Sequence, residues 1–433
     1  MSSIGLTSAL EDRIAIGDQA PGPLDRLACR IVLAGLEGLR GGAATLVLPD
    51  GTVRHFGDPA SRLSVRIEAA RWRAFRRLLT GGDLAAAESF MDGDWNTDDL
   101  VGVVRLFVAN AGRFDRDTPI TRATNLLTRA LHALRKNTLT GARRNIAAHY
   151  DLGNAFYRLF LDGTMTYSCA LFESASDTLE EAQERKWRRI ADLARLGPGM
   201  EVLEIGCGWG GFAAFAAKQY GCHVTGLTLS TEQESWAHAH AAKEGVSDRV
   251  AIRLEDWRRL PAEGKRYDRI VSVEMLEAVG HEYLGDFFEA CDRILAPEGI
   301  AAFQVITVPD HRHERLLGRP DFIKKHVFPG SHVPSVTAIS SALAVRTSLF
   351  IDRLEEIGPH YAETLRRWRM RFLTNRAEAA RQGFDERFLR MWEYYLAYCE
   401  GGFLERYVND VQFVLTRSGN RAFGPAPAYG GRA

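Results

Sequence analysis

The feature that most constrains this 433-residue chain is the segment VLEIGCGWGGFAAF, residues 202–215. A short apolar strand runs into a glycine-rich turn, and an alanine-rich helix follows. Gly206, Gly208 and Gly211 remove side chains where the backbone must turn sharply and lie close to a ligand. Amide groups at the start of the helix face the same space. The segment therefore predicts a site for an adenosine cofactor that carries an amino-acid tail.

The glycine spacing alone does not choose between two cofactors. It satisfies the dinucleotide pattern G-x-G-x-x-G as well as the needs of S-adenosylmethionine. A dinucleotide fold usually places an acid about 20 residues on, where it holds the ribose hydroxyls. Here the next strand ends in Gly226, Leu227 and Thr228, with no acid. Glu204, just before the first glycine, offers a carboxylate to an ammonium group, so S-adenosylmethionine is favoured.

Composition narrows the class of protein. The chain has 55 Lys and Arg residues against 55 Asp and Glu residues, so no net field attracts nucleic acid. Its six cysteines form no C-x-x-C pair, and we expect no metal at the active site. Glu11, Asp12 and Arg13 stand where a secretory signal would need an apolar core, and no long apolar run spans a bilayer. These features predict a cytoplasmic protein with reduced thiols.

The length indicates two or three domains. Residues 1–111 are expected to form a smaller α+β domain, because segments 45–48 and 53–56 flank the Asp-Gly pair at 50–51, which suits a tight hairpin turn. Residues 65–82 are expected to form a helix that ends on a glycine pair. This region carries no cluster of acids, bases or ligands. We therefore expect it to bind or position a substrate.

A basic stretch at 112–145 is expected to link the domains. It contains eight Lys or Arg residues and two Asp residues, and Arg122, Arg129 and Lys136 recur at heptad spacing on one helical face. The pattern fits a solvated interdomain helix. It fits equally a helix that lies on an anionic membrane surface, which would require a lipid substrate.

Residues 146–433 are expected to form a doubly wound, Rossmann-like α/β sheet, since strand and helix signals alternate. The strand signals lie at residues 201–205, 223–227, 250–254, 269–273 and 300–306. The Pro-Gly segment within 296–299 is expected to form a turn before the last of these strands. Because the glycine turn follows the first of them, the ligand is expected at the carboxyl edge of the sheet. Beyond about 310 we expect helices, whose aromatic side chains form core or line a tunnel for an acyl chain.

Further motifs follow one another along this domain: HYDLGNAFY (149–157), TYSCALFE (166–173), GLTLSTEQ (226–233), VSVEMLEAVGHEY (271–283), FPG (328–330) and PHYAETL (359–365). With the glycine turn they resemble the cyclopropane fatty acid synthase family, which includes the mycolic acid cyclopropane synthases. Residues 1–111 also resemble the extra N-terminal domain of its full-length members. The resemblance implies a class I methyltransferase fold. It also implies methyl transfer from S-adenosylmethionine to the double bond of an unsaturated acyl chain in a membrane phospholipid, giving a cyclopropane.

The resemblance implies roles for individual residues. A base must remove a proton from the transferred methyl group, and the resemblance implies that a bound bicarbonate serves as that base. The residues that match the catalytic site are Cys169, Glu277, Gln304, Ile306 and Tyr361. The residues expected to hold the cofactor are Tyr167, Ser168, Glu204, Gly206, Cys207, Gly208, Thr228, Ser230, Gln233, Asp256 and Trp257. Trp257 would stack near the adenine. Glu274, three positions before Glu277, is expected to be a solvated partner.

Two positions depart from the family pattern. Cyclopropane synthases carry a histidine where this chain has Gln304, and a histidine follows the glutamate where this chain has Ala278. Glutamine still donates a hydrogen bond to an anion but does not titrate near neutral pH. The pair EMLEAVG and QVIT resembles a branch of the family that makes methylene- or methyl-branched chains, as in the route to 10-methyl stearic acid. Both products stay open at this point.

The resemblance also implies a homodimer, peripheral contact with the inner face of the membrane and, for a methyl-branched product, a partner reductase. Three other functions remain open. A small-amine N-methyltransferase is one, because some plant alkaloid N-methyltransferases resemble the same core. A lipid-binding protein with an inactive methyltransferase fold is another. NAD-dependent oxidoreduction rests only on the shared glycine spacing.

Overall fold

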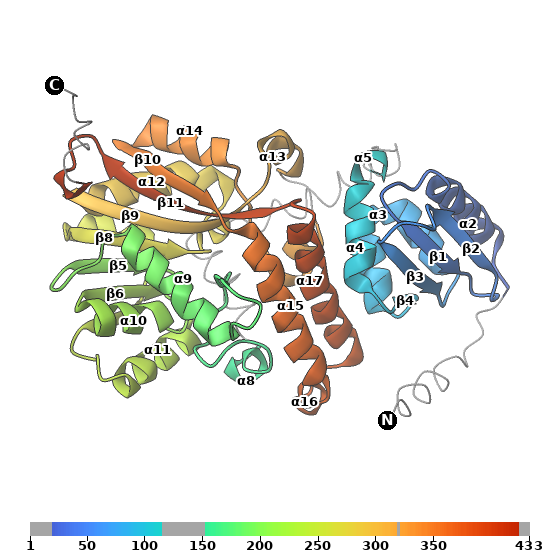
Figure 1. The fold of residues 1–433 in the computed structure, drawn as a ribbon, viewed down its shortest axis with the longest axis horizontal. Helices are drawn as coiled ribbons and strands as arrows, with labels where there is room; N and C mark the ends of the chain where they lie inside the picture. Colours follow the sequence, from blue (N-terminus) through green and yellow to red (C-terminus); the bar gives the residue numbers. More distant parts are fainter. Residues whose placement is uncertain (1–19, 115–151, 318–320, 424–433) are drawn as a thin grey trace, which may run out of the picture. The chain divides into compact units, whose positions relative to one another are not determined.

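The structure is a computed structural model that describes residues 20–114, 152–317 and 321–423. The chain divides into two compact units (Figure 1). The first comprises the described residues up to 114 together with Phe384–Gly401, and the second comprises the other described residues. The basic stretch expected at 112–145 falls, beyond residue 114, outside the described residues, so its membrane interpretation stays a prediction.

The first unit is an α+β unit. Its elements are α2 (Pro23–Leu36), β1 (Ala43–Val47), β2 (Val53–Gly57), β3 (Ser64–Ala69), α3 (Arg73–Met91), β4 (Trp95–Thr97), α4 (Leu100–Ala109), α5 (Ala111–Phe114) and most of α17 (Glu386–Leu404). The strands form one sheet in the order β2-β1-β3-β4. The expected hairpin is confirmed, because β1 pairs antiparallel with β2 and Val47 lies opposite Val53. Gly51 turns the chain at φ 83°.

The helix expected over 65–82 is wrong in its first third. Residues Ser64–Ala69 form β3, in which Val65 and Ala69 are buried. This alternation buries one face of the strand, and pairing with β1 and β4 outweighs the helical pattern. The glycine pair does not end the helix either. Instead α3 continues to Met91 across a kink at Gly82, which has φ 60°.

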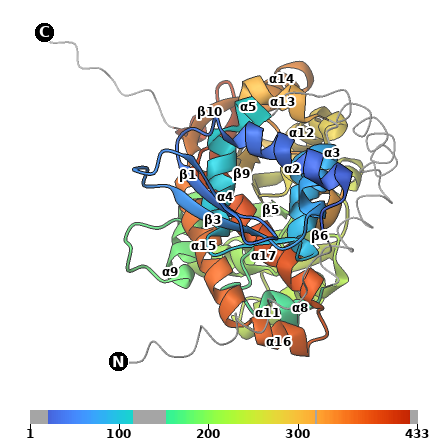
Figure 2. The same ribbon diagram turned by 90° about the vertical axis from the view of Figure 1, so that its right-hand side faces the viewer.

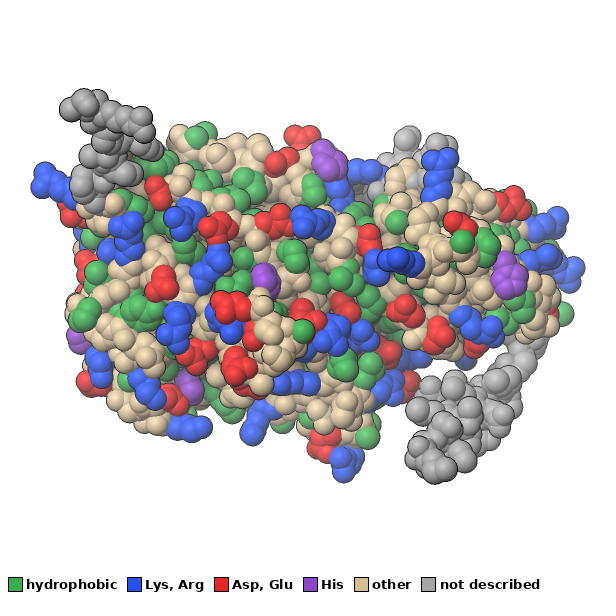
Figure 3. Space-filling view, viewed as in Figure 1, with side chains coloured by type: hydrophobic (Ala, Val, Ile, Leu, Met, Phe, Trp, Pro, Cys, Tyr) green, Lys and Arg blue, Asp and Glu red, His purple; other side chains and the backbone are tan. Residues whose placement is uncertain are grey.

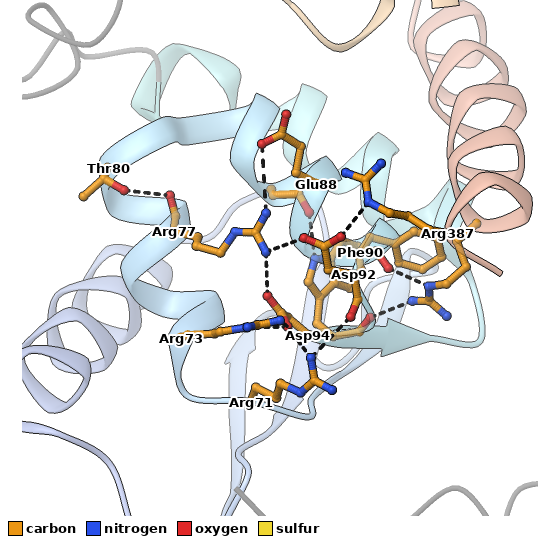
Figure 4. A network of polar contacts seen from close by, with 12 residues as sticks. Arg71, Arg73, Arg77, Thr80, Glu88, Phe90, Asp92, Asp94 and Arg387 are labelled. Carbon is orange, nitrogen blue, oxygen red and sulfur yellow. Dashed lines mark hydrogen bonds and ion pairs between the residues drawn. The ribbon is translucent and has the colours of Figure 1, made fainter. Parts of the chain in front are cut away.

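A buried carboxylate holds the first unit together (Figure 4). The side chain of Asp94 is fully buried and accepts hydrogen bonds from Arg73 at 2.8 Å and Arg77 at 2.9 Å. Asp92 accepts a hydrogen bond from Arg387 of α17 at 2.8 Å. Through such contacts Phe384–Gly401, expected within the methyltransferase domain, belongs instead to the first unit.

The second unit is built on a seven-stranded sheet in the order β10-β11-β9-β8-β5-β6-β7. The strands are β5 (Glu201–Ile205), β6 (His223–Thr228), β7 (Val250–Leu254), β8 (Tyr267–Val273), β9 (Leu295–Thr307), β10 (Leu349–Glu356) and β11 (Asn409–Arg417). Strands β5 to β9 are parallel, whereas β11 and β10 are added antiparallel at one edge. All five strands expected from the sequence are present, and the doubly wound fold class is confirmed.

Helices cover both faces of this sheet (Figures 1 and 2). The described α-helices of the second unit are α8 (Asn154–Tyr157), α9 (Leu179–Leu193), α10 (Gly211–Tyr220), α11 (Thr231–Lys243), α12 (Leu284–Ile294), α13 (Asp310–Leu316), α14 (Val336–Arg346), α15 (Gly358–Thr374) and α16 (Arg376–Arg381). Short helical turns are η1 (Trp257–Glu263), η2 (Leu276–Ala278), η3 (His281–Tyr283), η4 (Ile323–Val327) and η5 (Arg421–Phe423). Val202 packs in the core under α9, α10 and α11, whereas Leu203 and Ile205 pack in the core under α12 and α14. The period of two along β5 thus separates two apolar cores.

Two expectations for the second unit need correction. The chain beyond 310 is not wholly helical, because β10 and β11 form an antiparallel pair that extends the sheet. The Pro-Gly segment within 296–299 does not precede the last parallel strand. It lies inside β9 as an irregularity, since the pairing with β8 jumps from Leu295 to Ile300.

Acidic and basic side chains are interspersed over the face of the molecule that Figure 3 shows, as the balanced composition predicts. Within residues 20–114, 152–317 and 321–423, no helix is both long and apolar enough to cross a membrane.

Candidate active site

The candidate site lies where the strand order reverses. Strand β5 pairs with β6 on one side and with β8 on the other, and crevices at such points hold ligands in open α/β sheets. The carboxyl ends of the parallel strands meet at this edge. Because β11 runs antiparallel to β9, its first residues lie at the same edge. Segments far apart in the sequence therefore converge here.

The glycine turn after β5 has the backbone that the sequence predicts. Gly206, Gly208 and Gly210 have φ of 84°, 52° and 80°, values that favour glycine. A Cβ atom at Gly206 would lie 2.7 Å from the Met275 side chain. A Cβ atom at Gly208 would meet no heavy atom within 4 Å, so this side of the turn is open. Gly210 caps α10, whose first amide groups follow directly.

Glu204 meets the requirement for a carboxylate that receives an ammonium group. Its side chain is buried, and no described residue hydrogen bonds to Oε2. Burial raises the pKa of Glu204 to about 8, although Lys186 lowers it in part. Cys207, next in the turn, is a buried thiol whose pKa burial raises. A cationic ligand at Glu204 would relieve the cost of burying its charge.

Five of the remaining expected cofactor residues lie at or just after the ends of β6 and β7. Thr228 Oγ1 hydrogen bonds to Gln233 Oε1 at 2.8 Å, and Ser230 caps α11. Asp256 caps η1 and binds Arg258 at 2.6 Å. Trp257, Tyr167 and Ser168 are also in the second unit. The Trp257 ring is partly exposed and packs against Phe287 at 5.2 Å.

Glu274 is the centre of the site, and the expectation that it is a solvated partner is wrong. Its Oε1 accepts hydrogen bonds from the Cys169 amide and Gln304 Nε2, both at 2.7 Å. Its Oε2 accepts one from Tyr361 Oη at 2.6 Å. Glu274 has φ 49°, a left-handed conformation that disfavours non-glycine residues. Its amide donates to the Gln304 carbonyl at 2.7 Å, which holds this strained backbone in place.

These contacts decide how the site receives an anion. The Cys169 amide and the Tyr361 hydroxyl, two of the donors expected to hold bicarbonate, both donate to Glu274. Because Glu274 already accepts from both donors, the site does not fit a separate bicarbonate between them. The Glu274 carboxylate presents the same two-oxygen acceptor from within the chain.

Glu277 lies beside Glu274 in a different environment. Its Oε1 accepts a hydrogen bond from the Ile306 amide at 2.5 Å. Its buried Oε2 has no hydrogen-bond partner in the described part of the chain. Burial, with a smaller effect of the Glu274 charge, raises the pKa of Glu277 to about 8. Glu277 is therefore mainly protonated at neutral pH.

A third acid, Asp410 at the start of β11, was not expected from the sequence. It is fully buried, and its Oδ2 accepts a hydrogen bond from Gln304 Nε2 at 3.0 Å. Burial and the charge of Glu274 raise the pKa of Asp410 well above its ordinary value. Gln304, also fully buried, thus donates to two acids, and its Oε1 accepts from Gln412 at 3.0 Å. A neutral amide can bridge these acids without adding a charge.

Lys186 of α9 is the cationic residue of the site, and the sequence analysis missed it. Its side chain is 1% exposed, and Nζ donates to Ser168 Oγ at 2.6 Å. Burial lowers the pKa of Lys186, whereas the Glu274 carboxylate opposes this shift. The Lys186 charge in turn lowers the pKa of Glu274, whose burial raises it. A buried lysine next to acids stabilises one ionised carboxylate.

Aromatic rings adjoin the acids. Tyr167 lies 5.3 Å from Trp368 and 6.2 Å from Phe328, and Tyr157 and Phe160 pack within 6.2 Å of it. Together these rings form an aromatic wall. The wall adjoins Tyr361, whose ring lies 6.1 Å from that of Trp368. Such a wall excludes water, and its ring faces favour cations.

This sheet order, with a glycine turn after β5 and a buried acid ahead of it, defines an S-adenosylmethionine-dependent methyltransferase of the class I fold. The family model described as mycolic acid cyclopropane synthetase matches residues 137–413. The chain belongs to this family, as its motifs predict.

Three relatives illustrate the similarity. The chain is 40% identical to the tuberculostearic acid methyltransferase UfaA1 of Mycobacterium tuberculosis, over 86% of this chain and 88% of that protein. It is 37% identical to the cyclopropane-fatty-acyl-phospholipid synthase of Escherichia coli, over 79% of this chain and 85% of that protein. The crystal structure of mycolic acid cyclopropane synthase CmaA1 with SAH and CTAB is 32% identical with a TM-score of 0.59, and the match covers 64% of this chain and 98% of that chain.

Proposed function

We propose that the protein transfers a methylene group from S-adenosylmethionine to the double bond of an unsaturated fatty acyl chain of a membrane phospholipid, giving a cyclopropane. The observation that carries this proposal is the partly buried Glu274 carboxylate, which accepts hydrogen bonds from Cys169 and Tyr361 at the switch point beside the glycine turn. The similarity to the Escherichia coli synthase supports the substrate class.

The chemistry makes two demands on the site. When bound, S-adenosylmethionine supplies an electrophilic methyl group, which the π electrons of the double bond attack as the C–S bond breaks toward sulfur. The acyl chain is left with a carbocation, which must be kept from water. Loss of a proton from the new methyl group then closes the ring, because the C–H electron pair becomes the third ring bond. The site must therefore exclude water and accept one proton.

Glu274 is the proton acceptor in this proposal, in place of the bicarbonate that the resemblance implies. Three hydrogen bonds favour its ionised form, and Lys186 adds a positive charge nearby. Burial outweighs these contacts and raises the pKa of Glu274 above its ordinary value, but a carboxylate remains a weak base. A weak base suffices, since a proton next to a carbocation is strongly acidic.

The other acids keep the site near electrical balance. The raised pKa of Glu277, about 8, leaves this acid mainly protonated at neutral pH, and burial raises the pKa of Asp410 well above its ordinary value. The negative charge of Glu274 then faces the positive charge of Lys186. The aromatic wall around Tyr167 excludes water and stabilises the cationic acyl chain by its ring faces.

A second product is favoured by a specific observation. Gln304 stands where cyclopropane synthases carry histidine, and the chain is 40% identical to a tuberculostearic acid methyltransferase. If a hydride moves to the cationic carbon before the proton leaves, the same base yields a methylene-branched chain. A reductase partner would then complete a methyl branch. Membrane contact through residues 112–145 and a homodimer belong to the same proposal.

Substitutions at Glu274 test its role. Glu274→Gln should lower kcat by about 10²- to 10⁴-fold, because it removes the proton acceptor. Glu274→Gly should also be slow, but it releases the Cys169 and Tyr361 donors, so added bicarbonate or acetate should restore part of its rate. Exposed Glu282→Gln is the control and should act like wild type.

The measurement is labelled methyl transfer into vesicles of monounsaturated phospholipid, with bicarbonate removed or added. The wild-type rate should not depend on bicarbonate. A wild-type rate that falls on bicarbonate removal would assign the base to the bound anion instead. Methylation of amines without any lipid product would favour the small-amine alternative.

A further inference from the structure

Three histidines of the second unit come together from separate segments. His281 belongs to η3, His313 to α13, and His332 to the loop before α14. One ring nitrogen from each lies within 4.8 Å of the others. The ring centroids are 5.1 to 5.5 Å apart in all three pairs, so the rings face a common point.

The distances suit a shared metal ion. His313 Nε2 and His332 Nε2 are 3.1 Å apart. Two nitrogens on one tetrahedral Zn²⁺, with bonds of about 2.0–2.1 Å, are separated by about 3.3 Å. The nitrogens of His313 and His332 are thus already at the spacing of two ligands on one ion. The His281 side chain is exposed, so its rotation would bring the third nitrogen to the same ion.

A hydrogen bond between His313 and His332 is the simpler interpretation of that contact. It does not account for the third ring at the same point.

The three ligands are held by ordered backbone. The His332 amide donates to the Glu277 carbonyl at 2.7 Å, and the Val308 amide donates to the Pro334 carbonyl at 3.0 Å. These bonds fix the loop to the segment that carries Glu277 and to the end of β9. An ion at the three histidines would therefore tie together segments that border the candidate active site.

The charges around the cluster allow a cation. Asp310 and Glu314 of α13 lie near His313 and favour positive charge there. Lys324 lies near His332 and opposes it, but Lys324 itself pairs with Asp321 at 3.3 Å.

We propose that His281, His313 and His332 bind one first-row transition-metal ion of the zinc class, with water completing its coordination. Three imidazoles with an open position are a known zinc ligand set. The ion braces the segment that carries Glu277, and the proposal does not depend on which reaction the enzyme performs.

Metal titration of the full chain tests this site. Chelator-treated protein should take up one equivalent of Zn²⁺ in competition with a chromogenic chelator. Bound Co²⁺ should show the visible bands of a four- or five-coordinate nitrogen site, without the near-ultraviolet band of thiolate ligation. His313→Gln and His332→Gln should each weaken Zn²⁺ binding by at least about 100-fold.

The matched control is His311→Gln, because His311 is exposed on the same helix two residues from His313. It should bind Zn²⁺ like wild type, and far-UV circular dichroism should show that all variants are folded. Zn²⁺ at a hundredfold excess over Kd should raise the Tm of wild type by about 4 °C and leave His332→Gln unchanged. Equal binding by wild type and the two variants, or a thiolate band with Co²⁺, would overturn the proposal.

Discussion

Replacing Glu204 with glutamine tests how the site accepts the cofactor. Burial raises the pKa of Glu204 from its ordinary 4.5 to about 8, so the carboxyl is mainly protonated at pH 7. If the ammonium group of S-adenosylmethionine docks against it, the new positive charge should return its pKa toward 4.5. Cofactor binding should then expel a proton from Glu204.

The expected number of protons follows from these values. A group with a pKa of about 8 is about 90% protonated at pH 7, and one with a pKa near 4.5 is almost fully ionised. Wild type should therefore release about 0.9 proton per cofactor bound. Affinity should rise with pH below 8, by about tenfold per unit, because less work is needed to ionise Glu204. Glu204→Gln should release no proton from this position and should bind S-adenosylmethionine with little pH dependence.

Isothermal titration calorimetry measures both quantities. The binding enthalpy at pH 7, taken in buffers of different ionisation enthalpy, gives the number of protons released as a slope. Glu201→Gln is the control, because Glu201 is partly exposed at the start of the same strand and pairs with Lys265. Equal proton release by wild type and Glu204→Gln would refute the assignment of Glu204 to the ammonium group.

Three other substitutions give separate tests. Lys186→Met removes the cation that lowers the pKa of Glu274, so the acid limb of the pH–rate profile should move to higher pH; an unmoved limb would contradict the pairing. Asp94→Asn leaves its arginines without a buried carboxylate, and because those arginines are partly exposed, urea denaturation should show a loss of about 2 kcal/mol. Exposed Glu68→Gln should cost little by comparison. Gly208→Ala places a methyl group in open space at φ 52°, so calorimetry should show weaker cofactor binding, and a Tm unchanged within a few degrees would locate the effect at the ligand.

The parallel sheet and the glycine turn are predictable because their signals are local. Strands β5 to β8 stand out as apolar runs between helical segments, and their expected bounds agree with the structure to within two residues. The antiparallel pair of β10 and β11 was missed because Phe350 and Leu354 of β10 are exposed and the segment has no clean alternation. Residues 384–401 look like any amphipathic helix, and only contacts such as Arg387 with Asp92 place them in the first unit.

The site was predictable only in part. Cys169, Ile306 and Tyr361 do contact the acids, but the contacts of Cys169 and Tyr361 fall on Glu274 rather than on Glu277. The positive φ of Glu274, which turns its side chain inward, has no local sequence signal. Lys186 does have a local sequence signal, because it follows Leu179 and Ala182 on the buried face of α9, where a lysine is unusual. The three histidines are far apart in sequence and match no ligand spacing.

The central claim is that this chain moves a methyl group from S-adenosylmethionine to an acyl double bond, with Glu274 as the base. The most direct measurement is mass spectrometry of monounsaturated phospholipid vesicles after incubation with purified protein and methyl-deuterated S-adenosylmethionine in bicarbonate-free buffer. The account predicts lipids heavier by one CD₂ group, because one deuteron of the transferred methyl is lost to Glu274, and predicts little product with Glu274→Gln. Unlabelled lipids, or equal product from wild type and Glu274→Gln, would contradict it.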